Sequence, residues 1–205
     1  MAGPLSHIRV LDMSRVLAGP WAAQNLADLG AEVIKIERPG TGDDTRGWGP
    51  PWMKDAAGKD TSESAYFLSV NRNKKSVTLD ISKPEGQKIV RELALKSQVL
   101  VENYKVGNLK RYGLDYASLK KDNPGLIYCS VTGFGQDGPF AQAPGHDITY
   151  LGAAGLLSRL VASGVEPTPP QVSLSLPIGG LMAVVGILSA LSQRERTGHG
   201  PRPHR

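Results

Sequence analysis

The stretch IRVLDMSRVLAGPWAAQNLADLGAEVIKIER, residues 8–38, decides the fold class of this chain. It opens with a short apolar run that is typical of a buried strand. The turn-rich loop 14–20 follows and ends on Pro20, which fits the first turn of a helix because its missing N–H would have no partner there. That helix ends at Gly30, and residues 31–36 form a second apolar strand. The pattern predicts a βαβ unit with parallel, buried strands.

The same unit predicts where a ligand binds. Ligands of open parallel sheets bind outside the carboxyl ends of the strands. The loop 14–20 and the segment after Ile36 both fall at that edge. We therefore expect Arg15, Arg38 and the main-chain N–H groups of the loop to line one rim, which suits an anionic ligand.

Composition narrows the class of partner. The chain has 205 residues, of which 40% are hydrophobic and 21% charged, as in a globular domain with a core of its own. The formal charge of +5 is spread among loops. The basic run at 71–75 is short, and a solvated turn explains it as well as an anion-binding site does. Nucleic-acid binding calls for a basic stripe with interleaved aromatic residues. We therefore predict no nucleic-acid partner and favour a small phosphate-bearing molecule.

The N-terminus, the apolar runs and the cysteine content suggest a compartment. The first residues lack the architecture of a signal peptide, so a secreted protein is not expected. The longest apolar run, 176–191, contains glycines and ends at Gln193, and we predict a buried helix there rather than a membrane span. The single cysteine, Cys129, lies in an apolar run that predicts core packing. We expect a cytoplasmic protein, or in a eukaryote a protein of the mitochondrial or peroxisomal matrix.

The rest of the chain alternates between strand and helix patterns. Residues 39–65 form a long loop, rich in Gly and Pro at first and then polar and expected to be mobile. Ser82 and Glu85 have the spacing of a capping box and predict the start of a helix. Further predicted strands are residues 66–70, 76–81, 98–102 and 126–131. Further predicted helices are residues 82–95, 109–113, 116–122, 145–159 and 175–193, with a linker at 161–170 and a disordered tail at 197–205.

Residues 1–196 are thus predicted to form one α/β domain. The glycine-rich loop 133–139 has neither the GxxxxGK[ST] nor the GxGxxG pattern, so neither of the familiar nucleotide-binding loops is supported. We predict no metal site.

Several segments together resemble one family, the class III CoA-transferases. This family includes formyl-CoA transferases, succinyl-CoA:dicarboxylate transferases and 2-methylacyl-CoA racemases. The matching stretches cover nearly the whole chain in order. They are RVLDMSRVLAGPWAAQNLADLGAEVIKIERPGTGDDTRGWGPP, FLSVNRNKKSVTLDISKPEG, VLVENYKVGNLKRYGL, NPGLIYCSVTGFGQDGP, GHDITYLGAAGLLS and LMAVVGILSALSQRERTGHG. The N-terminal segments and residues 40–60 look most like the succinyl-CoA:glutarate type, whereas GHDITY looks closer to the racemases.

The resemblance implies a fold and an activity. The fold would be the large domain of such a transferase, Rossmann-like and doubly wound around a mostly parallel sheet, here incomplete. Family members move CoA between carboxylic acids through acyl-aspartyl and aspartyl-CoA intermediates, and this route divides one hard transfer into two easier ones. The implied substrates are an acyl-CoA and a carboxylic acid, with no permanently bound cofactor. An interlocked homodimer is the implied assembly.

The resemblance also implies which residues contact CoA. Arg38 and Arg111 are the natural phosphate partners, because a guanidinium presents several donors to phosphate oxygens. Each could instead be a surface salt-bridge residue. The full set carried over by position is Leu17, Ala18, Arg38, Leu79, Asp80, Ile81, Ser82, Asn103, Tyr104, Lys105, Arg111, Pro144, Gly145, His146 and Asp147.

His146 has two readings. In the racemase branch the histidine of GHD takes part in proton exchange at the α-carbon, a task for a group whose pKa lies near neutrality. By itself, a histidine that opens a helix is more often a capping residue or one whose hydrogen bonds are already satisfied.

The chain departs from the family pattern at the nucleophile. The catalytic aspartate of the family falls on Ser175 or Leu176, depending on a one-residue gap, and neither side chain can form a mixed anhydride. Family chains also continue through a second domain, so we expect this chain to be truncated. These departures leave open a non-catalytic CoA-binding fragment as the alternative to a transferase or a racemase.

Overall fold

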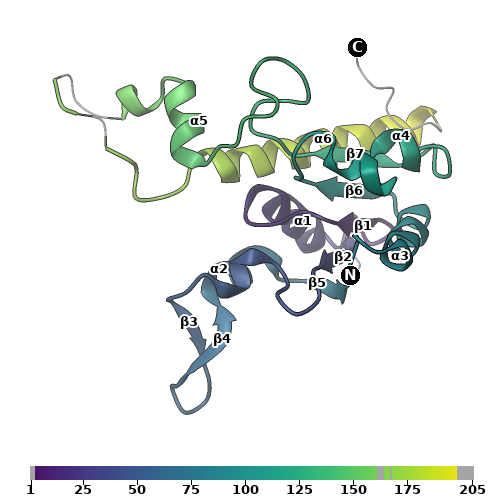
Figure 1. Ribbon diagram of the computed structural model, residues 1–205, viewed down its shortest axis with the longest axis horizontal. Helices are drawn as coiled ribbons and strands as arrows, with labels where there is room; N and C mark the ends of the chain where they lie inside the picture. Colours follow the sequence, from purple (N-terminus) through teal and green to yellow (C-terminus); the bar gives the residue numbers. More distant parts are fainter. Residues whose placement is uncertain (1–2, 161–163, 167, 198–205) are drawn as a thin grey trace.

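The computed structural model describes residues 3–160, 164–166 and 168–197 (Figure 1). The strands are β1 (Arg9–Asp12), β2 (Glu32–Glu37), β3 (Trp52–Lys54), β4 (Asp60–Ser64), β5 (Lys74–Thr78), β6 (Val99–Glu102) and β7 (Ile127–Ser130). The α-helices are α1 (Ala18–Asp28), α2 (Ala65–Asn71), α3 (Pro84–Leu95), α4 (Tyr116–Leu119), α5 (Asp147–Ala153) and α6 (Ser175–Thr197). The 3₁₀ helices are η1 (Asp44–Gly47), η2 (Asn108–Tyr112) and η3 (Leu157–Arg159).

A parallel sheet forms the middle layer, in the strand order β5-β2-β1-β6-β7. The predicted βαβ unit and the predicted α/β class are confirmed, because β1 pairs with β2 in parallel and Val10 lies opposite Val33. The chain proceeds outward from β1 to β5, then crosses back to β6 on the other side of β1. The strand order therefore reverses between β1 and β6, and such a switch point is where ligands of open α/β sheets bind.

Apolar side chains fill both faces of the sheet. Helices α1 and α6 cover one face, where the core residues include Val10, Leu26 and Ile187. Helix α3, η2 and α4 cover the other face, whose core includes Leu11 and Leu100 (Figure 1). This sandwich follows from right-handed crossovers that run in opposite directions from β1.

Cys129 packs against the core on the α1 and α6 face, as predicted. Burial raises the pKa of its thiol to about 11, so the sulfur stays protonated at neutral pH.

Helix α6 differs from its prediction as a buried helix. Its 23 residues bury one side, including Val184 and Ile187, whereas Leu181, Met182 and Val185 are exposed. Among the described residues it is the one helix whose length and apolar composition would allow it to cross a membrane, a test that core helices of globular proteins also pass. Figure 1 shows it lying along α1 and β7, and it continues to Thr197.

Two predicted strands are wrong in type or place. Residues 66–70 belong to helix α2, because the Ser64 hydroxyl accepts hydrogen bonds from the N–H groups of Tyr66 and Phe67 and so caps a helix. The strand predicted at 76–81 is β5, which begins at Lys74 and ends at Thr78, where its pairing with β2 stops.

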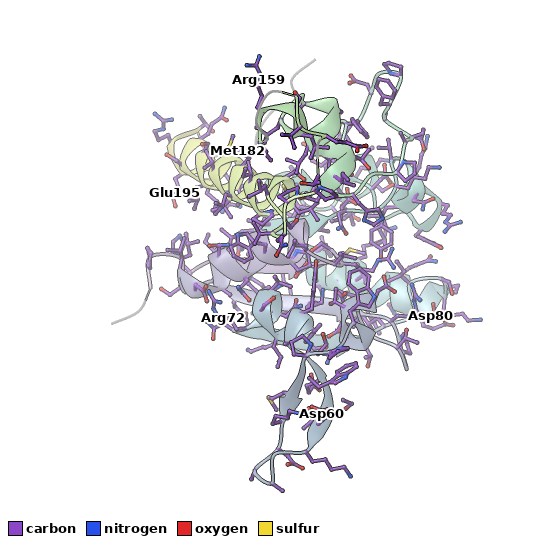
Figure 2. The ribbon with its side chains drawn as sticks, turned by 90° about the vertical axis from the view of Figure 1, so that its left-hand side faces the viewer. Asp60, Arg72, Asp80, Arg159, Met182 and Glu195 are labelled. Atoms are coloured by element: carbon purple, nitrogen blue, oxygen red, sulfur yellow. The ribbon has the colours of Figure 1, made fainter. Side chains whose placement is uncertain are left out.

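Other local predictions also change. Helix α3 begins at Pro84 without the Ser82–Glu85 capping box, because the Ser82 hydroxyl donates instead to Asp80 Oδ1 at 2.6 Å. The polar segment predicted to be mobile contains the hairpin β3–β4, which projects from the body with Asp60 on it (Figure 2). Helix α5 ends at Ala153, just before Gly155 with its φ of +70°, rather than near Arg159. Residues 198–205 of the predicted tail and 161–163 and 167 of the predicted linker lie outside the described residues.

Two ion pairs lie in the interior beside the carboxyl end of β1. Lys74 Nζ lies 2.8 Å from Asp12 Oδ2 and also donates to Pro20 O and Asn71 Oδ1. Lys35 Nζ lies 2.9 Å from Asp43 Oδ2, and both side chains are fully enclosed. Buried charges are tolerated only when paired and hydrogen-bonded, so these contacts constrain which segments meet.

A third pair attaches the long loop to the end of β2. Glu37 accepts hydrogen bonds from Arg46 Nε at 2.7 Å, Ser76 Oγ at 2.6 Å and Asp43 N at 2.9 Å. Burial by itself would raise the pKa of Glu37, but these hydrogen bonds and the Arg46 charge lower it to about 2. The guanidinium of Arg46 also stacks over the ring of Phe67 at 3.7 Å.

Neighbouring lysines on β5 give a matched test of the buried pair. Lys74→Met should lower the free energy of unfolding by about 3–5 kcal/mol, because it leaves the Asp12 carboxylate buried without its partner. Lys75→Met removes an exposed pair with Glu32 and should cost less than about 1 kcal/mol. Urea denaturation of the two variants measures the difference, and equal losses would contradict the role given to Asp12.

Glu37 predicts an acid-sensitive contribution to stability. Its pKa falls from 4.5 to about 2 on folding, so the contribution is present above about pH 4.5 and is lost as the pH falls toward 2. The free energy of unfolding of Glu37→Gln should therefore fall less steeply over that range than that of the wild type. Urea denaturation at a series of pH values measures both slopes. Glu63→Gln, which alters the half-exposed partner of the same Arg46, is the control, and identical slopes for Glu37→Gln and wild type would refute the assignment.

Candidate functional site

Two adjoining pockets open at the carboxyl edge of the sheet, and Tyr104 lines both. The first has a volume of about 430 Å³ and lies beyond the ends of β2, β5 and β6. The second has a volume of about 920 Å³ and lies beyond the ends of β1, β6 and β7. Together they occupy the switch point of the strand order, as the physics of open parallel sheets predicts.

Three arginines line the first pocket. Arg15 follows β1, Arg38 follows β2 and Arg111 lies in η2. Arg15 pairs with Asp44 at 2.8 Å, whereas the exposed Arg38 makes no ion pair or side-chain hydrogen bond with any residue that the structure describes. Arg111 lies over the ring of Tyr112 at 4.6 Å and is exposed. The pocket therefore offers guanidinium groups with unused donors to an anion.

Residues 79–82 form another wall of this pocket. Leu79 and Ile81 contribute apolar surface between the strand β5 and the helix α3. The carboxylate of Asp80 accepts hydrogen bonds from the N–H and hydroxyl of Ser82, and these lower its pKa. A turn fixed in this way leaves apolar side chains beside the arginines, an arrangement that suits a ligand with a flat base as well as phosphates.

The second pocket has mainly apolar walls. Phe134 and Tyr150 pack edge to face with their ring centroids 5.3 Å apart, and the Tyr150 hydroxyl donates to Gly145 O at 3.0 Å. Burial raises the pKa of Tyr150. A Cβ on Gly133 would lie 2.2 Å from the Tyr150 ring, so glycine is required there for the ring to pack.

His146 lines this pocket and is the N-cap residue of α5. Its main-chain N–H lies 3.4 Å from Thr149 Oγ1, and its main-chain carbonyl accepts the N–H of Thr149. The residue therefore opens a helix and lines a candidate ligand pocket at the same time, and its part in proton exchange stays a prediction.

The start of α6 also lines the second pocket, through Ser175 and Leu176. Asp147 Oδ1 accepts hydrogen bonds from the N–H of Leu174 at 3.0 Å and from the N–H and hydroxyl of Ser175, each at 2.6 Å. Burial opposes ionisation of Asp147, but these hydrogen bonds lower its pKa. The Ser175 hydroxyl is therefore occupied by a carboxylate, and Asp147 anchors the beginning of α6 to the beginning of α5.

The structure brings the predicted CoA contacts together. Those in the first pocket are Arg38, Leu79, Asp80, Ile81, Ser82, Tyr104 and Arg111. Those in the second are Leu17, Ala18, Asn103, Tyr104, Lys105, Pro144, Gly145 and His146. Asp147 lines neither pocket and holds α6 instead. The described residues contain no cluster of metal-ligating side chains.

The sequence-based predictions missed the buried residues that hold the loop after β1 in place. Lys35 is fully buried on β2 and donates to Ser14 O at 2.8 Å. Asp12 ends β1 and accepts the N–H of Ser14 at 2.9 Å. A signal was present, because a lysine inside the otherwise apolar strand EVIKIE and an aspartate after a buried strand both require partners.

Comparisons with known proteins show which family the chain resembles. The model of CoA-transferase family III matches residues 5–202. The chain is 49% identical over 197 residues to a succinyl-CoA:glutarate CoA-transferase of Mus musculus, covering 96% of this chain and 44% of that protein. It is 42% identical over 202 residues to an acetyl-CoA:oxalate CoA-transferase of Acetobacter aceti, covering 97% of this chain and 49% of that protein.

A solved structure shares the fold. The crystal structure of a CAIB/BAIF family protein from Brucella suis superimposes with a TM-score of 0.92 at 45% identity, covering 98% of this chain and 52% of that one. The chain spans about half the length of the curated relatives it matches. The family model and these relatives together show that the chain belongs to CoA-transferase family III.

Proposed function

We propose that this chain binds the CoA portion of an acyl-CoA across the two pockets and serves the movement of CoA between carboxylic acids. The observation that carries the proposal is the position of the arginines. Arg15, Arg38 and Arg111 come from three separate segments and line one pocket, which is joined through Tyr104 to a larger apolar one. Acyl donors such as succinyl-CoA and acceptors such as glutarate or oxalate are the substrates suggested by the names of the relatives.

The nucleotide end of CoA fits the first pocket. Its phosphates would lie against Arg38 and Arg111, whose guanidinium groups have donors to spare. Its adenine would lie against the apolar side chains of Leu79 and Ile81. The arm that carries the thiol would pass Tyr104 and enter the second pocket, where Lys105 and His146 are the basic residues of the lining.

The pocket residues suit the binding of CoA better than they suit the chemical step of the transfer. An aspartyl route needs a carboxylate that attacks the thioester, takes the acyl group and releases the CoA thiolate. At the corresponding place the second pocket presents Leu176, which has no carboxylate, and Ser175, whose hydroxyl donates to Asp147. This observation favours a second candidate function, in which the chain by itself binds CoA but does not transfer it.

A racemase is the third candidate, and the position of His146 favours it. An imidazole in the wall of the pocket for the acyl arm could exchange a proton at the carbon next to the thioester.

Removal of the Arg38 guanidinium tests binding. Arg38→Ala should weaken CoA binding by about tenfold or more, because a charge-assisted phosphate contact contributes roughly 1.5–3 kcal/mol. Isothermal titration calorimetry measures the affinity. Arg159→Ala is the control, since Arg159 is exposed, lines neither pocket and lies well away from Asp80 (Figure 2). Equal affinities of Arg38→Ala and wild type would remove the phosphate assignment.

A transfer assay separates the candidates. Transferase activity predicts that the purified chain converts succinyl-CoA and glutarate to glutaryl-CoA, as followed by liquid chromatography and mass spectrometry. CoA binding without this product would support the non-catalytic candidate. Racemase activity predicts deuterium uptake from solvent at the α-carbon of a 2-methylacyl-CoA, and His146→Ala should abolish that uptake.

A further inference from the structure

The loop between β1 and α1 contains the least favourable backbone conformation at the site. Val16 has a φ of +70°, in the left-handed region that β-branched residues rarely adopt. Such a conformation persists only where surrounding contacts enforce it. Arg15 on one side of it lines the first pocket, and Val16 and Leu17 line the second, so the strained residue lies where the pockets meet.

Side chains from other segments hold the main chain of this loop. The carbonyl of Ser14 accepts from Lys35 Nζ at 2.8 Å, and the N–H of Val16 lies 3.4 Å from Asp43 Oδ1. Asn103 binds both the main-chain N–H and the main-chain carbonyl of one loop residue. Its Oδ1 accepts the N–H of Arg15 at 2.8 Å, and its Nδ2 donates to the carbonyl of Arg15 at 2.7 Å.

Both hydrogen bonds of the Asn103 amide therefore fall on one residue, directly before Val16. They fix the two peptide groups that flank the Cα of Arg15, and the second of these is the peptide that leads into the strained φ. A neighbouring constraint acts from the other side, because a Cβ on Gly19 would lie 2.3 Å from the Cβ of Ser14. The loop thus has little room to relax unless the amide releases it.

We propose that Asn103 is a positioning residue that holds Val16 in the left-handed conformation and thereby sets the junction between the two pockets. The expected effect of Asn103 on CoA binding rests on the proposed function. Its expected effect on the conformation of the loop does not. The ion pair of Arg15 with Asp44 does not involve Asn103, so we expect the first pocket to keep its cations when the amide is removed. Leu17 and Ala18 in the second pocket are apolar, so their side chains cannot make an ion pair of this kind.

Limited proteolysis tests the inference without any ligand. Trypsin cleaves after arginine only where the chain opens locally. Asn103→Ala should raise the rate of cleavage between Arg15 and Val16 by about tenfold, which corresponds to about 1.4 kcal/mol of lost local stability. Cleavage after the exposed Arg159 should not change, and mass spectrometry of the fragments gives both rates from one digest.

Two further variants exclude a general loss of structure. Asn123→Ala removes another asparagine whose amide holds main-chain carbonyls, those of Ala94 and Ser97 at 3.0 Å each, far along the chain from the loop. It should leave cleavage after Arg15 at the wild-type rate. Val16→Gly, combined with Asn103→Ala, should bring the cleavage rate back toward wild type, because glycine adopts a positive φ without steric cost.

Binding measurements show the consequence for the junction. Asn103→Ala should weaken the binding of CoA by about tenfold, yet change the affinity for adenosine 3′,5′-bisphosphate less than about twofold. Wild-type cleavage after Arg15 in Asn103→Ala, or no rescue by Val16→Gly, would overturn the inference. Absence of CoA binding to the wild type would instead overturn the proposed function, and the cleavage result would still decide the role of Asn103.

Discussion

The loop that follows β1 carries the strain of this site, and buried polar side chains keep it in place. Lys35 cannot be solvated where it lies, so its ammonium group takes the carbonyl of Ser14 and the carboxylate of Asp43 as partners. These contacts join β2, the loop after β1 and the start of the long loop into one unit. A site built on such contacts is preorganised, since little remains to be ordered when a ligand arrives.

The charged groups in the interior differ from those at the surface of the site in whether they have partners. Beneath the site, Asp12, Glu37 and Asp43 each have a cationic partner, so the interior carries no uncompensated charge among these groups. At the surface, Arg38 has no described ion-pair partner. Paired charges hold structure, and an unpaired guanidinium at a pocket rim remains available to an anion. This difference between paired interior charges and an arginine without a described partner at the rim gives a physical basis for the proposed binding of a phosphorylated ligand at this edge of the sheet.

Catalysis makes a different demand from binding. The second pocket is mainly apolar, which would strengthen any electrostatic contact inside it. The start of α6, however, presents a hydroxyl and an aliphatic side chain where the proposed aspartyl route would need a carboxylate nucleophile. The Asp147 carboxylate nearby is engaged by main-chain N–H groups and by Ser175, so it serves to anchor the two helices. The arrangement therefore supports binding more strongly than turnover by this chain alone.

The sequence by itself determined the βαβ start, the parallel sheet and the edge at which Arg15 and Arg38 lie, because these depend on local periodicity, on Pro20 in the first turn of α1 and on Gly30 after the end of that helix. Family resemblance added residues that line the two pockets. Only the tertiary structure decided that residues 66–70 are helical and that Asn103 hydrogen-bonds both main-chain groups of Arg15. It also decided that Arg15 has an ion-pair partner, whereas Arg38 has none among the residues that the structure describes. For the ion pair of Arg15 and for the contacts of Asn103, the physical reason is distance along the chain, since even Asp44 lies 29 positions from Arg15. A capping hydroxyl acts within a few residues, but the Asn103 amide reaches a residue 88 positions away, and no local pattern encodes that contact.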